Sequence, residues 1–142
     1  MKVFEVATGN EICICEGHTH HVLSVAWRAD GRMLATGGAD KAIKIWEFPS
    51  GDQKRTIGGF GKEVTSLDFQ GLTENIVVTD GNSAVTTKTA SGGGGPTYSG
   101  PSGFVYCSGS SADGKTIAAG GERGILWIWA GGTSPTTFSP PP

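Results

Sequence analysis

Apolar and polar positions alternate in short runs along the chain. Ile43 and Ile45 flank Lys44 and are followed by Trp46, the period-two pattern of a half-buried strand. Residues 22–27 are rich in β-forming side chains, and a turn dipeptide, Asp-Gly, follows them. These runs predict many short strands joined by tight turns, and they do not describe a helical bundle.

The runs repeat along the sequence. The Asp30-Gly31 turn recurs 83 residues later as Asp113-Gly114, and half of that shift leads to a middle copy in which residues 63–69 match residues 21–27. After one extra residue in the middle copy, residues 35–38 align with 78–81. Four strands in each unit of roughly 40–45 residues are typical of a β-propeller blade.

The fourth strand of each unit is the least regular. Residues 11–15 and 53–57 predict such a strand before copies one and two. Residues 90–100 contain four consecutive glycines and predict a loop with at most a short strand, and residues 136–138 form a poor fourth strand before three prolines. The predicted organisation is a leading fourth-type strand in 1–15, blade repeats in 16–57, 58–100 and 101–130, and a tail rich in Pro, Gly, Ser and Thr in 131–142.

Composition limits the classes of partner. Eleven basic and 13 acidic side chains leave a formal charge of −2, which predicts binding to neither nucleic acid nor an anionic membrane. No apolar run approaches the roughly 20 residues of a membrane span. The N-terminus has no apolar signal segment, so we expect a cytoplasmic chain, or an exported one if it is a fragment of a larger protein.

A resemblance to a known family begins at Gly17-His18 and ends at Trp46-Glu47. This stretch resembles the WD-repeat (WD40) family, with Glu47 where the family prefers Asp. The resemblance implies an all-β fold of three four-stranded antiparallel propeller blades, a partial propeller that closes by oligomerisation or with a partner. It also implies a structural hydrogen-bonded set made of His18, Thr36, Asp40 and Trp46.

The later copies depart from the family pattern. Copy three keeps an aromatic residue, Trp129, at the position of Trp46. The other positions of the set hold Phe60, Thr79, Ser83 and Thr89 in copy two, and Pro101, Ala119 and Arg123 in copy three. We expect these two blades to be held by burial of Leu67, Phe69, Ile76, Val77, Val78, Phe104, Ile117, Ile125, Trp127 and Trp129.

Histidines and cysteines are the most reactive candidates. His20 and His21 lie near His18, but a metal ion needs three or four ligands and no matching Asp, Glu or Cys group is identifiable, so no metal site is predicted. Cys13 and Cys15 share one face of a predicted strand and are expected to act as small apolar residues. Cys107 is expected to be a lone cysteine of a core strand.

Catalytic motifs are missing from the sequence. No G-x-S-x-G elbow occurs, and the glycines at 92–95 lack the Lys-Ser/Thr of a phosphate loop. We therefore predict neither enzymatic activity nor a cofactor. Residues 57–64 resemble bacterial WD-repeat propellers found beside cytochrome c modules, although the chain has no CxxCH haem site.

The leading functional hypothesis is a non-enzymatic scaffold for protein interaction and assembly. The alternative is a purely structural fragment of a larger propeller, possibly from a bacterial chain linked to cytochrome c modules. Partners would be other proteins or copies of this chain, with the N-terminal strand of one copy completing the last blade of the next, giving six blades from two copies or nine from three. The positions nominated for partner contacts, which could also be merely solvated turns, are His20, Ala39, Lys62, Asn82, Gly103 and Glu122.

Overall fold

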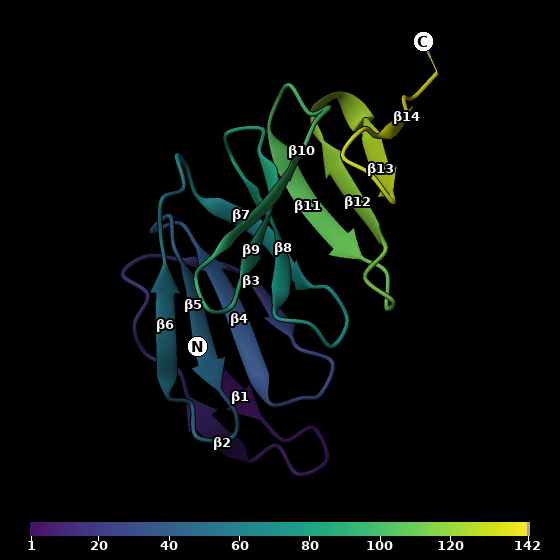
Figure 1. Cartoon of the computed structure of the whole chain (residues 1–142). Helices are drawn as coiled ribbons and strands as arrows, with labels where there is room; N and C mark the ends of the chain where they lie inside the picture. Colours follow the sequence, from purple (N-terminus) through teal and green to yellow (C-terminus); the bar gives the residue numbers. More distant parts are fainter. Residues whose placement is uncertain (142) are drawn as a thin grey trace.

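The computed structural model describes residues 1–141, and strands dominate the chain. Successive strands pair antiparallel and form three four-stranded sheets: blade 1 (β3–β6), blade 2 (β7–β10) and blade 3 (β11–β14). β1 and β2 form a separate hairpin, at the opposite end of the molecule from β14 (Figure 1). This arrangement confirms the all-β prediction. The elements are β1 (Lys2–Phe4), β2 (Glu11–Ile14), β3 (Val22–Trp27), β4 (Met33–Gly38), β5 (Ile43–Glu47), β6 (Gln53–Ile57), β7 (Val64–Phe69), β8 (Asn75–Asp80), β9 (Val85–Thr89), β10 (Gly94–Tyr98), β11 (Val105–Ser110), β12 (Thr116–Gly121), a short 3-10 turn (Glu122–Gly124), β13 (Leu126–Ala130) and β14 (Thr136–Phe138).

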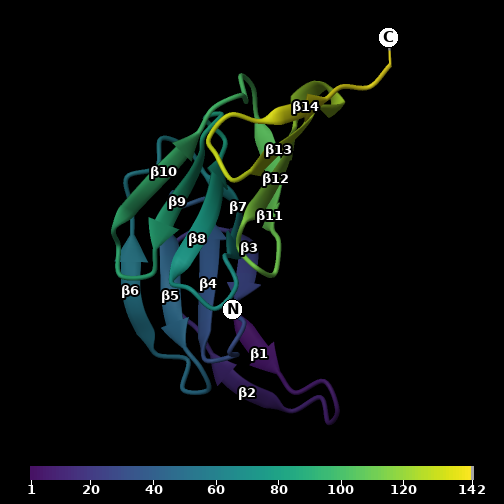
Figure 2. The ribbon, with the colours of Figure 1, turned by 45° about the vertical axis from the view of Figure 1, so that its right-hand side comes forward.

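The three blades stand side by side with β3, β7 and β11 adjacent, as the turned view in Figure 2 shows. Hydroxyl side chains join these inner strands. Ser24 Oγ accepts the Leu67 N–H at 3.1 Å, and Ser66 Oγ accepts the Ser108 N–H at the same distance. Because Ser24 and Ser66 occupy equivalent positions 42 residues apart, each blade holds the next by the same contact.

Apolar layers between the blades form the core. One layer joins blades 1 and 2 and includes Ala35, Ile43 and Leu67, and a second joins blades 2 and 3 around Trp127. Gly37 allows the closest approach in the first layer, because a Cβ there would lie 2.5 Å from Val64 Cγ1. The core therefore depends on flat strand faces that pack against each other, rather than on one central cluster.

The first three strands of blade 2 are offset from those of blade 1 by 42 residues. The Gly38 N–H bonds the Ala42 carbonyl at 3.1 Å, and the Asp80 N–H makes the equivalent bond to Ala84 at 3.2 Å. The prediction of an inserted residue in copy two is therefore wrong.

Strand pairing gives the same register. Thr36 faces Lys44 in blade 1, and Val78 faces Thr86 in blade 2. Since side chains alternate along a strand, a slip of one residue exchanges the two faces of the blade. The residues of blade 2 that correspond to Thr36, Asp40 and Trp46 are Val78, Asn82 and Lys88, in place of Thr79, Ser83 and Thr89.

Both doubtful fourth strands are present. β10 begins at Gly94, inside the glycine run, and a register shift between Gly94 and Thr97 accommodates it in the pairing with β9. β14 pairs with β13 through Leu126–Phe138, Trp127–Thr137 and Ile128–Thr136. The expectation that the last blade lacks a fourth strand is wrong, because β14 already occupies its outer edge.

The N-terminal segment is a hairpin rather than a single strand. Val3 pairs with Cys13, and the Met1 ammonium group donates to the Cys15 carbonyl at 2.8 Å. One face of the hairpin packs against Leu34 and Trp46 of blade 1. A shift of 42 residues relates this hairpin to β5–β6, so it corresponds to the outer half of a blade.

Candidate functional site

Four polar side chains of blade 1 form one continuous set of hydrogen bonds. His18 Nδ1 lies 2.8 and 2.9 Å from the two carboxylate oxygens of Asp40, and His18 Nε2 lies 2.7 Å from Thr36 Oγ1. Trp46 Nε1 donates to the same hydroxyl oxygen at 2.8 Å. With Nδ1 donating to Asp40, Nε2 accepts the Thr36 proton, so every group in the set has a partner.

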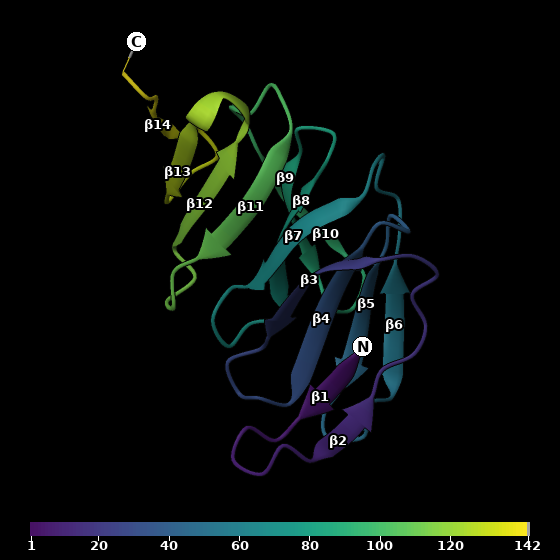
Figure 3. The ribbon, with the colours of Figure 1, turned by 180° about the vertical axis from the view of Figure 1, so that it is seen from behind.

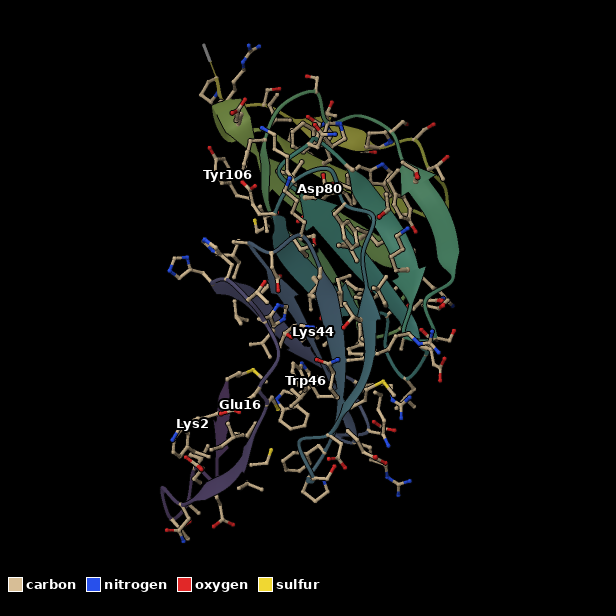
Figure 4. All side chains as sticks on the ribbon, turned by 90° about the vertical axis from the view of Figure 1, so that its left-hand side faces the viewer. Lys2, Glu16, Lys44, Trp46, Asp80 and Tyr106 are labelled. Carbon is tan, nitrogen blue, oxygen red and sulfur yellow. The ribbon has the colours of Figure 1, made fainter. Side chains whose placement is uncertain are left out.

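Asp40 is the charged end of this set. Burial alone would raise the pKa of Asp40, but hydrogen bonds from His18 and from the Thr19 N–H favour the carboxylate and leave the pKa below its usual value. The Asp40 side chain retains only 9% of its exposure. The carboxylate therefore fixes the segment before β3 onto the β4–β5 turn. In Figure 4, Lys44 and Trp46 lie inside blade 1, whereas Lys2 lies on the N-terminal hairpin.

Five of the six nominated contact positions occupy equivalent places at one end of the blades, and Asn82 lies one residue after Gly81, which is the counterpart of Ala39. In blade 1, the segment before the inner strand is bound to the β4–β5 turn by the Ala39 N–H, which donates to the His21 carbonyl at 2.8 Å. Gly81 makes the equivalent bond to Glu63 in blade 2, at 3.0 Å, and Glu122 makes it to Phe104 in blade 3, at 2.9 Å. The structure thus brings His20 beside Ala39, Lys62 beside Asn82, and Gly103 beside Glu122.

These positions differ in exposure. His20, Lys62, Asn82 and Glu122 are exposed, whereas Ala39 and Gly103 are half-buried. Four residues (His18, Thr19, His20 and His21) line an open hollow of about 400 Å³, in which the rings of His20 and His21 meet edge to face at 4.7 Å.

An aromatic pair at blade 3 was missed by the sequence analysis. The rings of Phe104 and Tyr106 lie 4.8 Å apart, and Tyr106 is 58% exposed. Phe104 is half-buried, as is Ile125, although both were expected in the core. The sequence carried a signal for this pair, because Tyr106 follows Thr65 of blade 2 by 41 residues and therefore belongs to the inner strand.

The three cysteines lie in two environments. Cys13 and Cys15 are buried on one face of β2, and burial raises the pKa of Cys15, with a further contribution from its neighbour Cys13. Cys107 is exposed, so the prediction that it belongs to the core is wrong. Its side chain lies on the face of blade 3 that no following blade covers, beside Ala118 and Leu126.

Two further features bear on the chemistry of residues 1–141. Within this range, no group of three or more His, Cys, Asp or Glu side chains is placed to hold a metal ion. Nor does any helix in the same range have the length and hydropathy to cross a bilayer. The four polar side chains that blade 1 brings together form hydrogen bonds to one another.

Comparisons with known proteins agree with the blade architecture. The chain is 32% identical over 114 residues to Protein tipD of Dictyostelium discoideum, covering 80% of this chain and 18% of that protein. It is 33% identical over 75 residues to Nuclear distribution protein PAC1 of Tuber melanosporum, covering 53% of this chain and 17% of that protein. The chain thus spans about a fifth of the length of these relatives.

Solved structures show the same fold. The structure of U3-55K superposes with a TM-score of 0.87 at 25% identity, covering 97% of this chain and 45% of that chain. The WD40 repeats of RRP9 give a TM-score of 0.86 at 25% identity, with 97% and 44% covered. The family profile WD40, described as WD domain, G-beta repeat, matches residues 9–47 and 95–130, more than half of the sequence. This chain belongs to the WD40-repeat family.

Proposed function

We propose that this chain is a non-enzymatic scaffold for protein interaction and assembly. The observation that carries the proposal is the threefold repetition of one local geometry, in which the segment before each inner strand is bound to a neighbouring turn. A rigid row of equivalent turns offers a preorganised surface, and preorganisation lowers the entropic cost of binding. We call the surface made by the six nominated residues the turn surface.

The composition of the turn surface favours a protein partner. It carries one basic residue, Lys62, and one acidic residue, Glu122, together with the neutral amide of Asn82. The Phe104–Tyr106 pair adds exposed aromatic area beside it. Aromatic side chains are enriched at protein interfaces, whereas a nucleic-acid site would need clustered basic groups.

The partners in this proposal are other proteins or further copies of this chain. Two copies would bring together six complete blades and three would bring together nine. Donation of an N-terminal strand to blade 3 is not part of the proposal, because β14 fills that edge. We place the protein in the cytoplasm, with no nucleic acid, membrane or cofactor among its partners.

A second candidate function is purely structural, as part of a larger propeller. Both ends of the blade row favour this alternative, since Val25 of blade 1 is 53% exposed and Leu126 of blade 3 is 40% exposed. The chain also corresponds to less than half of the U3-55K chain. In that role the chain would bind other blades and no separate partner.

A capture experiment separates the two candidates. The immobilised chain is exposed to cell extract, in parallel with a triple variant of the turn surface, His20→Ala, Lys62→Ala and Glu122→Ala. The matched control places the same number of alanines at exposed positions of the opposite turns, with Arg32→Ala, Glu74→Ala and Lys115→Ala. The scaffold proposal expects proteins that the wild type and the control retain and the triple variant loses. Equal retention by all three chains, or none by any of them, would contradict it.

A further inference from the structure

One face of blade 1 is only half covered. Its outer part packs under the N-terminal hairpin, where Leu34 and Trp46 are each 1% exposed. Its inner part, on β3, leaves Leu23, Val25 and Trp27 exposed at 47%, 53% and 43%.

Blade 2 shows what such a face does when it is covered. The residues 42 positions after Val25 and Trp27 are Leu67 and Phe69, and they are 3% and 4% exposed because blade 1 packs against them. Leu23, Val25 and Trp27 therefore form an apolar strip on β3 that no other part of residues 1–141 covers.

The hairpin that covers Leu34 and Trp46 has an open edge on the side toward the exposed residues of β3. Figure 3 shows β1 on the side of the hairpin toward β4 and β2 on the side toward β6. Within residues 1–141, β1 pairs only with β2, so the edge of β1 that faces the uncovered strip has no strand of the described chain beside it. An unpaired edge readily adds a further strand.

The outward face of the hairpin is uncovered and largely apolar, with Lys2 beside Ile14. Cys13 and Cys15 point toward blade 1, and the alternating residues Ile12 and Ile14 point away from it, each 43% exposed. Phe4 adds to this outward face at 53% exposure. Two apolar faces thus adjoin the same open edge of β1, on opposite sides of the hairpin.

We propose that a second copy of this chain occupies this place through its own N-terminal hairpin. The β1 strands of the two copies pair along their open edges and form one four-stranded sheet in the order β2-β1-β1-β2. The outward face of each hairpin, with Phe4, Ile12 and Ile14, then covers Leu23, Val25 and Trp27 of the other copy. A single symmetric contact covers all six exposed residues, as a two-fold interface requires.

The symmetry fixes the direction of the pairing. Antiparallel pairing of two identical strands places the two-fold axis perpendicular to the sheet and turns the same hairpin face of both copies to one side. Both copies of blade 1 would then occupy the same volume. Parallel pairing places the axis along the strands and turns the second hairpin over, so that the shared sheet lies between the two copies of blade 1.

Blade 3 does not offer a second docking site for the hairpin. Its outer edge is occupied by β14, and its uncovered face combines small residues such as Ala118 and Gly120 with the exposed Leu126 and Phe138. That face lies at the far end of the molecule from β1, so it contributes nothing to the proposed contact (Figure 1).

The proposal rests on the assembly function given above, and it is tested by solution mass. Light scattering at micromolar concentration should give twice the chain mass of 14.6 kDa for the wild type. Val25→Glu and Ile14→Glu should each reduce the mass to that of one chain, because each places a carboxylate inside the contact. Leu126→Glu, a change at a residue of similar exposure on blade 3, should leave the doubled mass unchanged.

Complementation sharpens the test. An equimolar mixture of Ile14→Lys and Val25→Glu chains should recover the doubled mass, because one of its two contacts is native and the other pairs opposite charges. Circular dichroism must show cooperative melting for every variant, since the changed residues are exposed and each chain should remain folded.

Three results would overturn the proposal: a single-chain wild type, a trimer, or a dimer that Leu126→Glu disrupts and Val25→Glu does not. The capture experiment is independent of these results. A single-chain protein that still retains partners through the turn surface would refute only the dimer, and a dimer that retains none would refute only the turn-surface role.

Discussion

Blades 1 and 2 share the backbone of their first three strands and differ in their interiors. β4 and β8 have six residues each, β5 and β9 have five each, and the turn between them has a positive φ at Lys41 (59°) and at Ser83 (65°). The four polar positions of blade 1 are His18, Thr36, Asp40 and Trp46. The corresponding positions of blade 2 are Phe60, Val78, Asn82 and Lys88.

Blade 2 replaces the buried hydrogen bonds by other contacts. The Lys88 ammonium lies 5.8 Å from the centre of the Phe60 ring, and Val78 is fully enclosed at 1% exposure. Asp80 Oδ1 accepts the N–H groups of Asn82 and Ala84 and so holds the β8–β9 turn from within. The difference teaches that strand pattern and turn geometry determine the blade, and that the polar set is one of several ways to fill it.

The largest expected effect is at the fourth position of the polar set, which is Trp46 in blade 1 and Lys88 in blade 2. Trp46→Ala removes a side chain that is 1% exposed, packs under the N-terminal hairpin and donates to Thr36. We expect a loss of about 3–5 kcal/mol in the free energy of unfolding, measured by urea denaturation. Lys88→Ala should cost about 0.5–1 kcal/mol, because it removes only a cation–π contact. Equal losses would show that the two interiors are equivalent.

The charged end of the set gives the next contrast. Asp40→Ala leaves the His18 Nδ1–H and the Thr19 N–H without their acceptor, at a cost of about 1–3 kcal/mol. Asp113→Ala removes an exposed carboxylate that binds Ser111 and the Lys115 N–H, and it should cost much less than Asp40→Ala. Identical urea midpoints for the two variants would contradict this ranking.

The sequence predicted the parts of the fold that repeat. The period of strands and turns was sufficient to give three blades, and the residues His18, Thr36, Asp40 and Trp46 lie where one hydrogen-bonded set requires them. These features depend on local pattern and on spacing within one blade.

The parts that failed depend on pairing between strands. Copy two has no His or Trp at the positions of His18 and Trp46 to fix its register, so its sequence favours an inserted residue and aligns Thr79, in place of Val78, with Thr36. β10 and β14 contain Gly and Thr in place of the usual apolar alternation, and their strands arise from pairing with β9 and β13. The exposure of Cys107 depends on the packing of blade 3 against other blades, which no local pattern records.

A smaller effect tests the corrected register. Val78→Thr introduces a hydroxyl at the position of Thr36, where Phe60 and Lys88 offer no partner like His18 and Trp46. We expect a loss of about 1–2 kcal/mol in the free energy of unfolding. The same change combined with Phe60→His, Asn82→Asp and Lys88→Trp should cost less than the sum of the separate changes, because the four new side chains can bond one another. Simple additivity would argue against the register.

The smallest expected effect is the pH dependence of blade 1. Because the pKa of Asp40 is lowered in the folded chain, its carboxylate stabilises the fold fully above the unfolded pKa, and this contribution is lost as the pH falls through the lower folded pKa. The stability difference between the wild type and Asp40→Asn should therefore be constant near neutral pH and narrow below about pH 4. The lowered pKa values of Asp30 and Asp113 are common to both chains and cancel in this difference. Urea midpoints measured from pH 7 down to acid test the expectation, and a difference that widens on acidification would reverse the sign assigned to Asp40.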